Sequence, residues 1–221
     1  MDIALEFGFS HEQSYIRAFK HKWGVSPGEY RSRKLLLPIT PAISLSSLVS
    51  VGDDSALVLP GLVMRQSLHL CGVRRFITDS DNSQYNSVAS IAREFMSDIL
   101  PSITHRVYAD RYFGFVEHCP DPNDNWYMAS TELRQGPVKK RQTNIEYRSI
   151  PPGMYHEFLL VARTHPANLL WQDVECLYGM IFDTWVKDNR NRLEPGWHLE
   201  FIDVSVAHDD YSEFRILIPA R

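Results

Sequence analysis

The chain has 221 residues, of which 44% are hydrophobic and 23% charged, and its formal net charge at pH 7 is −4. This composition is that of an ordinary soluble globular protein. No apolar run approaches the roughly 20 residues of a membrane-spanning helix, and the first residues lack the basic and apolar regions of a signal peptide, so we expect a cytoplasmic protein with no membrane partner.

The charge is distributed unevenly along the chain. Residues 1–34 contain six Lys and Arg residues and four acidic residues, a balance of +2. The remaining residues hold 17 basic and 23 acidic side chains, a balance of −6. A basic segment joined to an acidic body indicates that only the first segment contacts a polyanion.

The first 34 residues predict three short helices. Residues 3–7 form a helical run that ends at Gly8, a natural C-cap. Residues 10–13, Ser-His-Glu-Gln, are typical of a capping box that opens a second helix, which Gly24 ends. Ser26-Pro27 then supplies an N-cap and a first helical residue for a third helix. Two short helices joined by a glycine-containing turn are what a helix-turn-helix requires.

The second helix has an apolar side and a polar side. At 3.6 residues per turn, its apolar side carries Tyr15, Ile16, Phe19 and Trp23. On the polar side we expect Gln13, Ser14 and Arg17 to reach base edges in a major groove. Four basic residues would contact phosphates and set the register on the DNA, namely Lys20, Lys22, Arg31 and Arg33.

This segment resembles a known family. The stretch from Ile3 to Arg31, IALEFGFSHEQSYIRAFKHKWGVSPGEYR, resembles the second helix-turn-helix of AraC-family transcription regulators. It departs from the family at Ile16, where Phe is usual, and keeps that position apolar. The resemblance implies a bacterial regulator that binds DNA and meets RNA polymerase.

AraC-type DNA-binding domains contain two such motifs, and this chain begins inside the second. Either Met1 is a late start in a longer regulator, or half of the DNA reader is missing. A single motif makes few phosphate contacts, so we expect weak DNA binding at physiological salt unless a dimer or the missing half contributes.

Residues 35–61 predict a linker. Pro38 and Pro41 interrupt the segment, which has no sustained helical or strand period. The apolar runs 35–37 and 57–59 are too hydrophobic for free coil, so we expect a connector that is partly anchored on the protein.

Residues 62–221 predict two β-α-β-β repeats. The alternation and helical spacing of apolar residues give the first repeat as strand 62–76, helix 87–99 and strands 111–117 and 126–133. The second repeat runs as a bent strand 145–162, helix 170–186 and strands 197–206 and 214–218. Two such units imply an α+β fold with a pseudo-twofold sheet, both helices on one face and a cleft between the halves.

The body resembles the GyrI-like effector-binding domain of Rob-like and BmrR-like regulators. The matching motifs are Tyr127-Met128-Ala129, Ile150-Pro151-Pro152-Gly153-x-Tyr155, Leu199-Glu200-Phe201 and Ile216-Leu217-Ile218-Pro219. In that family an acidic residue lies at the bottom of an aromatic-lined cleft and meets cationic, lipophilic effectors, and Glu200 matches it. The resemblance therefore implies a small-molecule site at Glu200.

The aromatic residues that we expect near Glu200 are Trp126, Tyr127, Tyr155 and Trp197. A carboxylate in an apolar pocket favours a cation, and each aromatic face adds about 0.5–2 kcal/mol of cation–π attraction. The alternatives are a surface or salt-bridged strand position for Glu200, and simple core packing for the aromatic residues.

Other chemical motifs are incomplete. His156-Glu157 lacks the second histidine of a zinc-protease helix, because Leu160 stands there. Asp121, Asn123 and Asn125 have calcium-loop spacing, but Trp126 occupies the glycine position, so this segment predicts a hairpin turn. Three widely spaced cysteines, Cys71, Cys119 and Cys176, form neither a disulfide framework nor a zinc motif. We therefore expect no metal and no cofactor.

These observations favour a ligand-responsive transcription regulator over an enzyme. Some GyrI-like proteins hydrolyse small molecules with a glutamate in the same cleft, so a hydrolase using Glu200 as general base is one alternative. A protein-binding module of the gyrase-inhibitor type is another.

Overall fold

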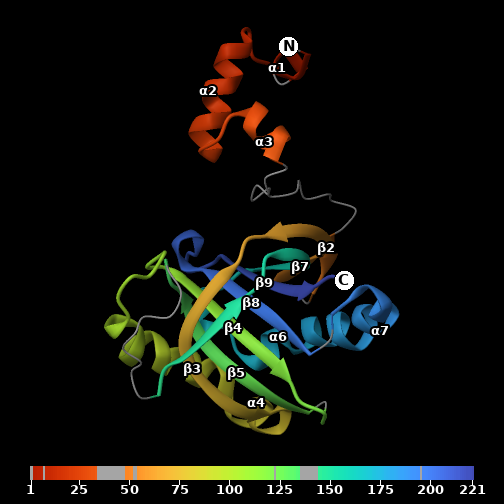
Figure 1. Cartoon of the computed structure of the whole chain (residues 1–221). Helices are drawn as coiled ribbons and strands as arrows, with labels where there is room; N and C mark the ends of the chain where they lie inside the picture. Colours follow the sequence, from red (N-terminus) through yellow and green to blue (C-terminus); the bar gives the residue numbers. More distant parts are fainter. Residues whose placement is uncertain are drawn as a thin grey trace. The chain divides into compact units, whose positions relative to one another are not determined.

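The structure is a computed structural model that describes residues 2–6, 8–33, 48–51, 54–121, 123–134, 144–194 and 196–221. The chain divides into two compact units, residues 1–39 and 40–221, and Figure 1 shows the elements of each. Within the described ranges, no helix is both long and apolar enough to cross a membrane.

The first unit contains three helices, α1 (Asp2–Glu6), α2 (Glu12–Trp23) and α3 (Pro27–Arg33). Gly8 and Gly24 adopt the left-handed conformation with φ of 77° and 74°, which glycine adopts without steric cost. At the start of α3, the Ser26 hydroxyl accepts from the Glu29 amide at 3.2 Å, and the Glu29 carboxylate accepts from the Ser26 amide at 2.8 Å. The predicted cap at Ser26 is therefore confirmed.

The predicted capping box of the second helix is wrong. Helix α2 is capped by His11, whose side chain makes no capping hydrogen bond. The backbone explains the difference, because the amides of Ser14 and Tyr15 both donate to the His11 carbonyl, so the helix begins one residue after the position that Ser10 could cap.

Aromatic rings pack α2 against α3. Phe19 lies 5.8 Å from Tyr15, 6.5 Å from Trp23 and 5.9 Å from Tyr30, measured between ring centroids. Tyr15, Phe19 and Trp23 lie on the predicted apolar side of α2, although Ile16, assigned to the same side, is exposed. The side chains predicted to contact DNA are also exposed, namely Gln13, Ser14, Arg17, Lys20, Lys22 and Arg31.

The second unit is built on an antiparallel sheet. In the part of the chain that the structure describes, the sheet has nine strands in the order β1-β2-β7-β9-β8-β4-β5-β3-β6. The strands are β1 (Leu48–Ser50), β2 (Ser55–Arg65), β3 (Leu68–Thr78), β4 (Arg111–His118), β5 (Asp124–Glu132), β6 (Glu146–Ile150), β7 (Gly153–Ala162), β8 (Trp197–Asp203) and β9 (Ser212–Pro219).

In each repeat, a helical segment made of three consecutive pieces lies between the strands. In the first repeat the pieces are α4 (Asp79–Tyr85), α5 (Ser87–Glu94) and a π-helical extension (Phe95–Ile99). In the second they are α6 (Trp171–Tyr178), a π-helical extension (Gly179–Trp185) and α7 (Val186–Asp188). Short 3-10 turns cover Leu100–Ser102, Pro166–Asn168, Arg190–Arg192 and Val204–Val206.

The strand order confirms the predicted α+β fold with two repeats. The sequence β7-β9-β8 on one side of the sheet mirrors β3-β5-β4 on the other, and β8 pairs with β4 at the centre. The paired run of β4 and β8 extends from Arg111–Asp203 to Glu117–Trp197, and its midpoint is the pair Gly114–Glu200. A twofold axis between the strands therefore passes beside these two residues and makes their positions equivalent in the two repeats. The middle of the sheet is therefore where the two halves meet.

The segment predicted as a linker is structured in part. Strand β2 begins at Ser55, inside the predicted linker 35–61, and pairs with β7 along its length. The register shifts between Val58 and Gly61, so Pro60 sits in a bulge, where its missing amide donor is tolerated. Residues 35–47 and 52–53 of the predicted linker lie outside the described residues.

The two faces of the sheet pack differently. On one face, Phe95 joins a cluster with Val73 and Tyr127, and Leu177 and Ile181 of the second helical segment join another with Phe158. The opposite face holds a third cluster, which includes Val63, Leu70, Phe115, Ile150, Tyr155 and Leu199. Since its members come from β2, β3, β6 and β7 at both ends of the sheet, the sheet curls around this cluster (Figure 1).

Candidate functional site

Glu200 is a buried carboxylate at the centre of the sheet, on the face that the helices cover. Its residue is 6% exposed, and its strand β8 lies between β4 and β9. Alternation along β8 places His198, Glu200 and Ile202 on this face, and Ile202 contacts both helix-covered clusters. Glu200 therefore lies between the hydrophobic clusters of the two repeats.

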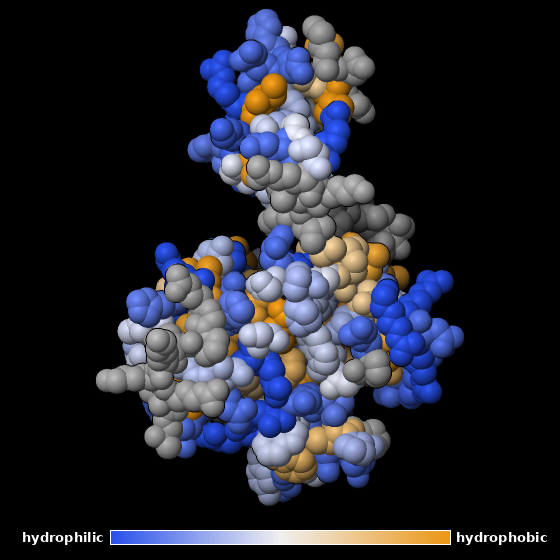
Figure 2. Space-filling view, viewed as in Figure 1, coloured by the Kyte–Doolittle hydropathy of each residue, from blue (hydrophilic) through white to orange (hydrophobic). Residues whose placement is uncertain are grey.

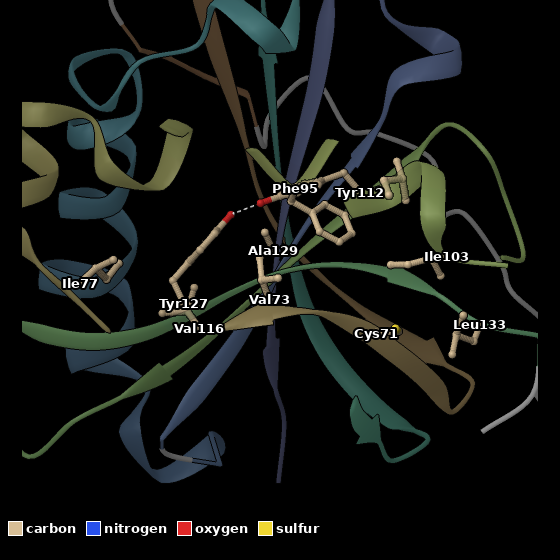
Figure 3. Close-up of a cluster of buried hydrophobic side chains, with 11 residues drawn as sticks. Cys71, Val73, Ile77, Phe95, Ile103, Tyr112, Val116, Tyr127, Ala129 and Leu133 are labelled. Carbon is tan, nitrogen blue, oxygen red and sulfur yellow. Dashed lines mark hydrogen bonds between the residues drawn. The ribbon is translucent and has the colours of Figure 1, made fainter. Parts of the chain in front are cut away.

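Two tyrosine hydroxyls hold the Glu200 carboxylate. Tyr127 of β5 donates to Oε2 at 3.1 Å, and Tyr178 of α6 donates to Oε1. Tyr112 of β4 lies 2.6 Å from the Tyr127 hydroxyl, and this hydrogen bond is drawn in Figure 3. Hydroxyl groups from both repeats thus converge on one carboxylate.

Gly114 leaves the space that this carboxylate occupies. A Cβ atom at Gly114 would overlap Glu200 Oε2, and it would lie 2.7 Å from the Tyr127 hydroxyl and 3.1 Å from Glu200 Cβ. Real Cβ atoms are almost never found as close to another heavy atom as this Cβ would be to Glu200 Oε2. The polar cluster therefore requires glycine at the position equivalent to Glu200 in the first repeat.

A histidine pair borders the carboxylate. His198 Nδ1 lies 3.1 Å from His118 Nε2, and His118 Nδ1 lies 3.0 Å from Asn125 Oδ1. His198 Nε2 is 4.0 Å from Glu200 Oε1 and has no hydrogen-bond partner among the described residues. Burial holds the pKa of His198 well below its ordinary value, and the nearby His118 acts in the same direction. His198 is therefore neutral and does not compensate the charge of Glu200.

Burial also dominates the protonation of Glu200. Removal from water raises the pKa of Glu200, whereas the hydrogen bonds from Tyr178 and Tyr127 act in the opposite direction. The same burial, with the nearby Glu200 charge, holds the pKa of Tyr127 and Tyr178 well above the ordinary value, so both remain hydrogen-bond donors. No Lys or Arg of the described ranges forms an ion pair with Glu200.

Aromatic rings of the second helical segment cover the site. Phe182 lies 4.8 Å from His198 and stacks on Tyr178 at 5.4 Å, and Trp171 lies 5.3 Å from Tyr178. All of these distances join ring centroids. The carboxylate thus lies beneath a layer of aromatic side chains, which can attract a cation through their faces.

The structure brings together only part of the predicted site. Glu200 and Tyr127 are hydrogen-bonded neighbours, as expected from the sequence. Trp126, Tyr155 and Trp197 lie on the opposite face of the sheet, where Trp197 contacts Phe115 and Tyr155, and Trp126 contacts Phe76. Their placement beside Glu200 is corrected, because Trp126 and Trp197 are an odd number of residues from Tyr127 and Glu200 along their strands.

Sequence reasoning missed Tyr112, Tyr178 and His198. Tyr178 lies within the predicted helix 170–186, and the sequence suggested no role for its hydroxyl group. A buried tyrosine hydroxyl nearly always has a hydrogen-bond partner, and this rule would have pointed from Tyr178 to a buried acceptor.

The fold of the body also occurs in other solved structures. Among solved structures, the chain is similar to SAV2435, determined with bound tetraphenylphosphonium, with a TM-score of 0.55 and 12% identity over 73% of this chain and 93% of that chain. It is also similar to a Vibrio cholerae integron cassette protein, VCH_CASS2, with a TM-score of 0.52 and 13% identity over 76% of this chain and 100% of that chain.

A third similar structure is a protein from Staphylococcus aureus described as a candidate bacterial transcription regulation protein. Its TM-score is 0.50 at 12% identity, over 73% of this chain and 97% of that chain. No protein-family model matches the chain, and no curated protein matches it. At these identities the comparisons establish the fold of the body.

Proposed function

We propose that this protein is a bacterial transcription regulator of the AraC type, whose body binds a lipophilic cation at Glu200 and whose first unit binds DNA. The observation that carries the proposal is a buried carboxylate that has two tyrosine donors and no cationic partner among the described residues. An unpaired buried charge is unfavourable, and a cation that also fits between aromatic rings would relieve that cost.

The chemistry of the site favours a cation with a hydrophobic surface. The surrounding rings of Tyr178, Phe182 and Trp171 offer area for apolar contact and cation–π attraction of about 0.5–2 kcal/mol each. A strongly hydrated ammonium ion would lose more hydration on entering such a site than a large organic cation would. The tetraphenylphosphonium bound to SAV2435 belongs to this second class.

Entry of a ligand requires the covering segment to move. The Glu200 side chain is 8% exposed, and Tyr178 and Phe182 cover it from α6 and its π-helical extension. π-helical turns are rare in proteins and frequently occur at functional sites. We propose that ligand binding displaces this segment, which would supply the conformational change that a regulator needs.

Tryptophan fluorescence during titration with tetraphenylphosphonium tests the cation site. The wild-type chain should show saturable quenching, and Glu200→Gln should weaken binding about tenfold or more, roughly 1.4 kcal/mol. Glu175→Gln, on the exposed side of α6, is the matched control and should bind as wild type. Absence of saturable binding by the wild type, or equal effects of the two substitutions, would refute the assignment.

The DNA-binding part of the proposal rests on the exposed polar side of α2 and on the AraC resemblance. Duplexes selected from a random library should bind more tightly than random duplexes. Gln13→Ala should reduce this preference, because we assign Gln13 to base edges, whereas Lys20→Ala should weaken both kinds of duplex equally. If the wild-type chain shows no preference for any selected duplex, a sequence-reading role is refuted. Dimerisation and contact with RNA polymerase are the further partners that this proposal implies.

We propose a binding role and not a catalytic one for Glu200. Both carboxylate oxygens accept a tyrosine hydroxyl, and these hydrogen bonds stabilise the charged form and so oppose the abstraction of a proton from an attacking water. Turnover of an activated ester by the wild type that Glu200→Gln abolishes would instead favour the hydrolase alternative.

A further inference from the structure

The face of the sheet opposite Glu200 carries a second aromatic cluster, and this one is associated with arginines. Phe76 of β3 and Trp126 of β5 are cross-strand neighbours whose ring centroids are 5.4 Å apart. Both are large and exposed, Phe76 at 49% and Trp126 at 36%. Figure 2, viewed onto this face, shows hydrophobic side chains along its middle beside strongly hydrophilic ones.

Two arginines lie over aromatic rings of this face. The Arg74 guanidinium is 4.2 Å from the centre of the Trp126 ring, and the Arg148 guanidinium is 5.2 Å from the centre of the Phe115 ring. Arg74 is on β3 and Arg148 is on β6, so neighbouring strands hold the two guanidinium groups on the same face. Each therefore presents its planar group beside an aromatic surface.

The two arginines share a single carboxylate. Arg74 donates to Glu117 Oε2 at 2.6 Å, and Arg148 donates to the same oxygen at 3.1 Å. The three groups together carry a formal charge of +1, and Arg74 Nε has no hydrogen-bond partner among the described residues. Two guanidinium groups on one carboxylate leave positive charge and donor capacity for a second anion.

We propose that this face is a second ligand site, which binds a planar aromatic anion such as an arylsulfonate or aryl carboxylate. The ring of the ligand would pack on Phe76 and Trp126, and its anionic group would accept hydrogen bonds from Arg148 and Arg74. Its charge selectivity is opposite to that of the Glu200 site, and the proposal does not depend on a ligand binding there. Large contiguous apolar patches on protein surfaces often mark ligand-binding or partner sites.

Other charged groups share this face. Arg65 and Arg215 are paired with Glu157 and Glu213, a balanced group of two positive and two negative charges. By strand alternation Asp124, Glu132 and Glu146 also lie on this face, and none of them forms an ion pair with Arg74 or Arg148 among the described residues. The ion-paired group next to the exposed rings, Arg74, Arg148 and Glu117, carries a formal charge of +1. Arg148 has a side chain that is 36% exposed, so its substitution removes charge with little disturbance of packing.

A pair of fluorescent probes of matched shape tests the proposal on the full chain. The anionic probe is 1-anilinonaphthalene-8-sulfonate, and its neutral counterpart is N-phenyl-1-naphthylamine. The wild-type protein should bind the anionic probe at least tenfold more tightly. Arg148→Gln should reduce that preference about fivefold or more, and Arg74→Gln should act in the same direction.

Three controls make the outcome decisive. Arg163→Gln removes an exposed arginine that pairs with Asp54 on another part of the body, so it should leave the preference unchanged. Glu200→Gln should also leave anion binding unchanged, because Glu200 lies on the other face. Thermal melting of Arg148→Gln and Arg74→Gln shows that each variant is folded.

The proposal is overturned if the wild type binds both probes equally, or if Arg148→Gln and Arg163→Gln behave alike. A loss of anion binding in Glu200→Gln would also overturn it, because the probe would then occupy the site on the helix-covered face. Failure of tetraphenylphosphonium to bind at all would contradict the cation site alone and leave this second site standing.

Discussion

Gly114 and Glu200 face each other across the central β4–β8 pair, and the side chain that Gly114 lacks leaves the space for the Glu200 carboxylate. The two residues hold equivalent positions in the two repeats, so the repeats have diverged at the point where they meet. A carboxylate in both repeats would bring two buried negative charges together, which is strongly unfavourable. One glutamate and one glycine give a single charged site at the pseudo-twofold axis.

Gly114→Ala should disrupt the polar cluster. The added methyl group would overlap Glu200 Oε2 and the Tyr127 hydroxyl, so we expect a loss of about 1–3 kcal/mol in the free energy of unfolding, as for other overpacked cores. Binding of tetraphenylphosphonium should fall at least tenfold. Urea unfolding and fluorescence titration measure the two effects.

Gly179→Ala is the matched control for that substitution. Gly179 has an ordinary helical φ of −58°, and the nearest atom to an added Cβ is Asp183 Oδ2 at 3.9 Å. Alanine should be neutral or slightly stabilising there. Equal stability of the Gly114→Ala variant and the wild type would contradict the close packing around Glu200.

Cation binding should strengthen as the pH rises. Burial raises the pKa of Glu200 above its ordinary value of 4.5, so the carboxyl is neutral below the raised pKa and charged above it. Affinity for tetraphenylphosphonium, which carries a permanent charge, should increase by up to about tenfold per pH unit below that pKa and level off above it. Titrations across this range give the curve, and Glu200→Gln should flatten it.

The stability of the unliganded protein should change in the opposite sense. The unfolded carboxyl of Glu200 ionises near its ordinary pKa, before the folded one does. Between these two pKa values the folded state holds more protons, so stability decreases as the pH rises through this window. A wild-type stability curve that matches that of Glu200→Gln would contradict this account.

Tyr178→Phe should move the pH midpoint of cation binding upward. The Tyr178 hydroxyl donates to Glu200 Oε1 and lowers the pKa of that carboxyl, so its removal leaves the effect of burial less opposed. Tyr155→Phe provides the control, because the Tyr155 hydroxyl donates to the Pro151 carbonyl on the opposite face at 2.9 Å. It should reduce stability by about 1 kcal/mol without moving the midpoint.

His198 should make the folded protein sensitive to acid. Burial lowers the pKa of His198 well below the ordinary 6.5, and it also lowers that of His118. Below pH 6.5 the unfolded histidines bind protons that the folded ones do not, so stability is lost as the pH falls, by up to about 1.4 kcal/mol per pH unit for each histidine.

Urea unfolding at pH 7.5, 6.5 and 5.5 tests this sensitivity. His198→Phe keeps a ring beside Phe182 and should reduce the acid slope by up to one proton, whereas His208→Gln changes an exposed histidine and should leave the slope as it is. An unchanged slope in His198→Phe would show that His198 takes up its proton in the folded state.

The sequence predicted the order of elements better than the contents of the site. Apolar periodicity identified both repeats, because their strands and helices bury one side each. Residues 55–61 of strand β2 were assigned to the linker, and residues 62–65 were joined to β3 in the single predicted strand 62–76. Pro60-Gly61 interrupts the alternation of β2, and the bulge that accommodates them appears only once β7 is beside it.

The site could have been predicted more closely from strand geometry alone. Trp126 and Tyr127 are adjacent in one strand, so their side chains point to opposite faces, and only one of them could have joined Glu200. The same rule separates Trp197 from Glu200. Tyr178 could not be paired with Glu200 from the sequence, because that contact depends on how the helix packs on the sheet.

The topology of the body also constrains how it folds during synthesis. Ser55 pairs with Ala162 and Arg65 with Gly153, so β2 leaves the ribosome long before its neighbour β7 exists. Until then its hydrogen-bonding edge is open to other chains, which is a known route to aggregation. Pairings this distant in sequence also slow folding. We expect a nascent chain that stalls before residue 153 to need a chaperone, whereas the completed chain closes its own sheet.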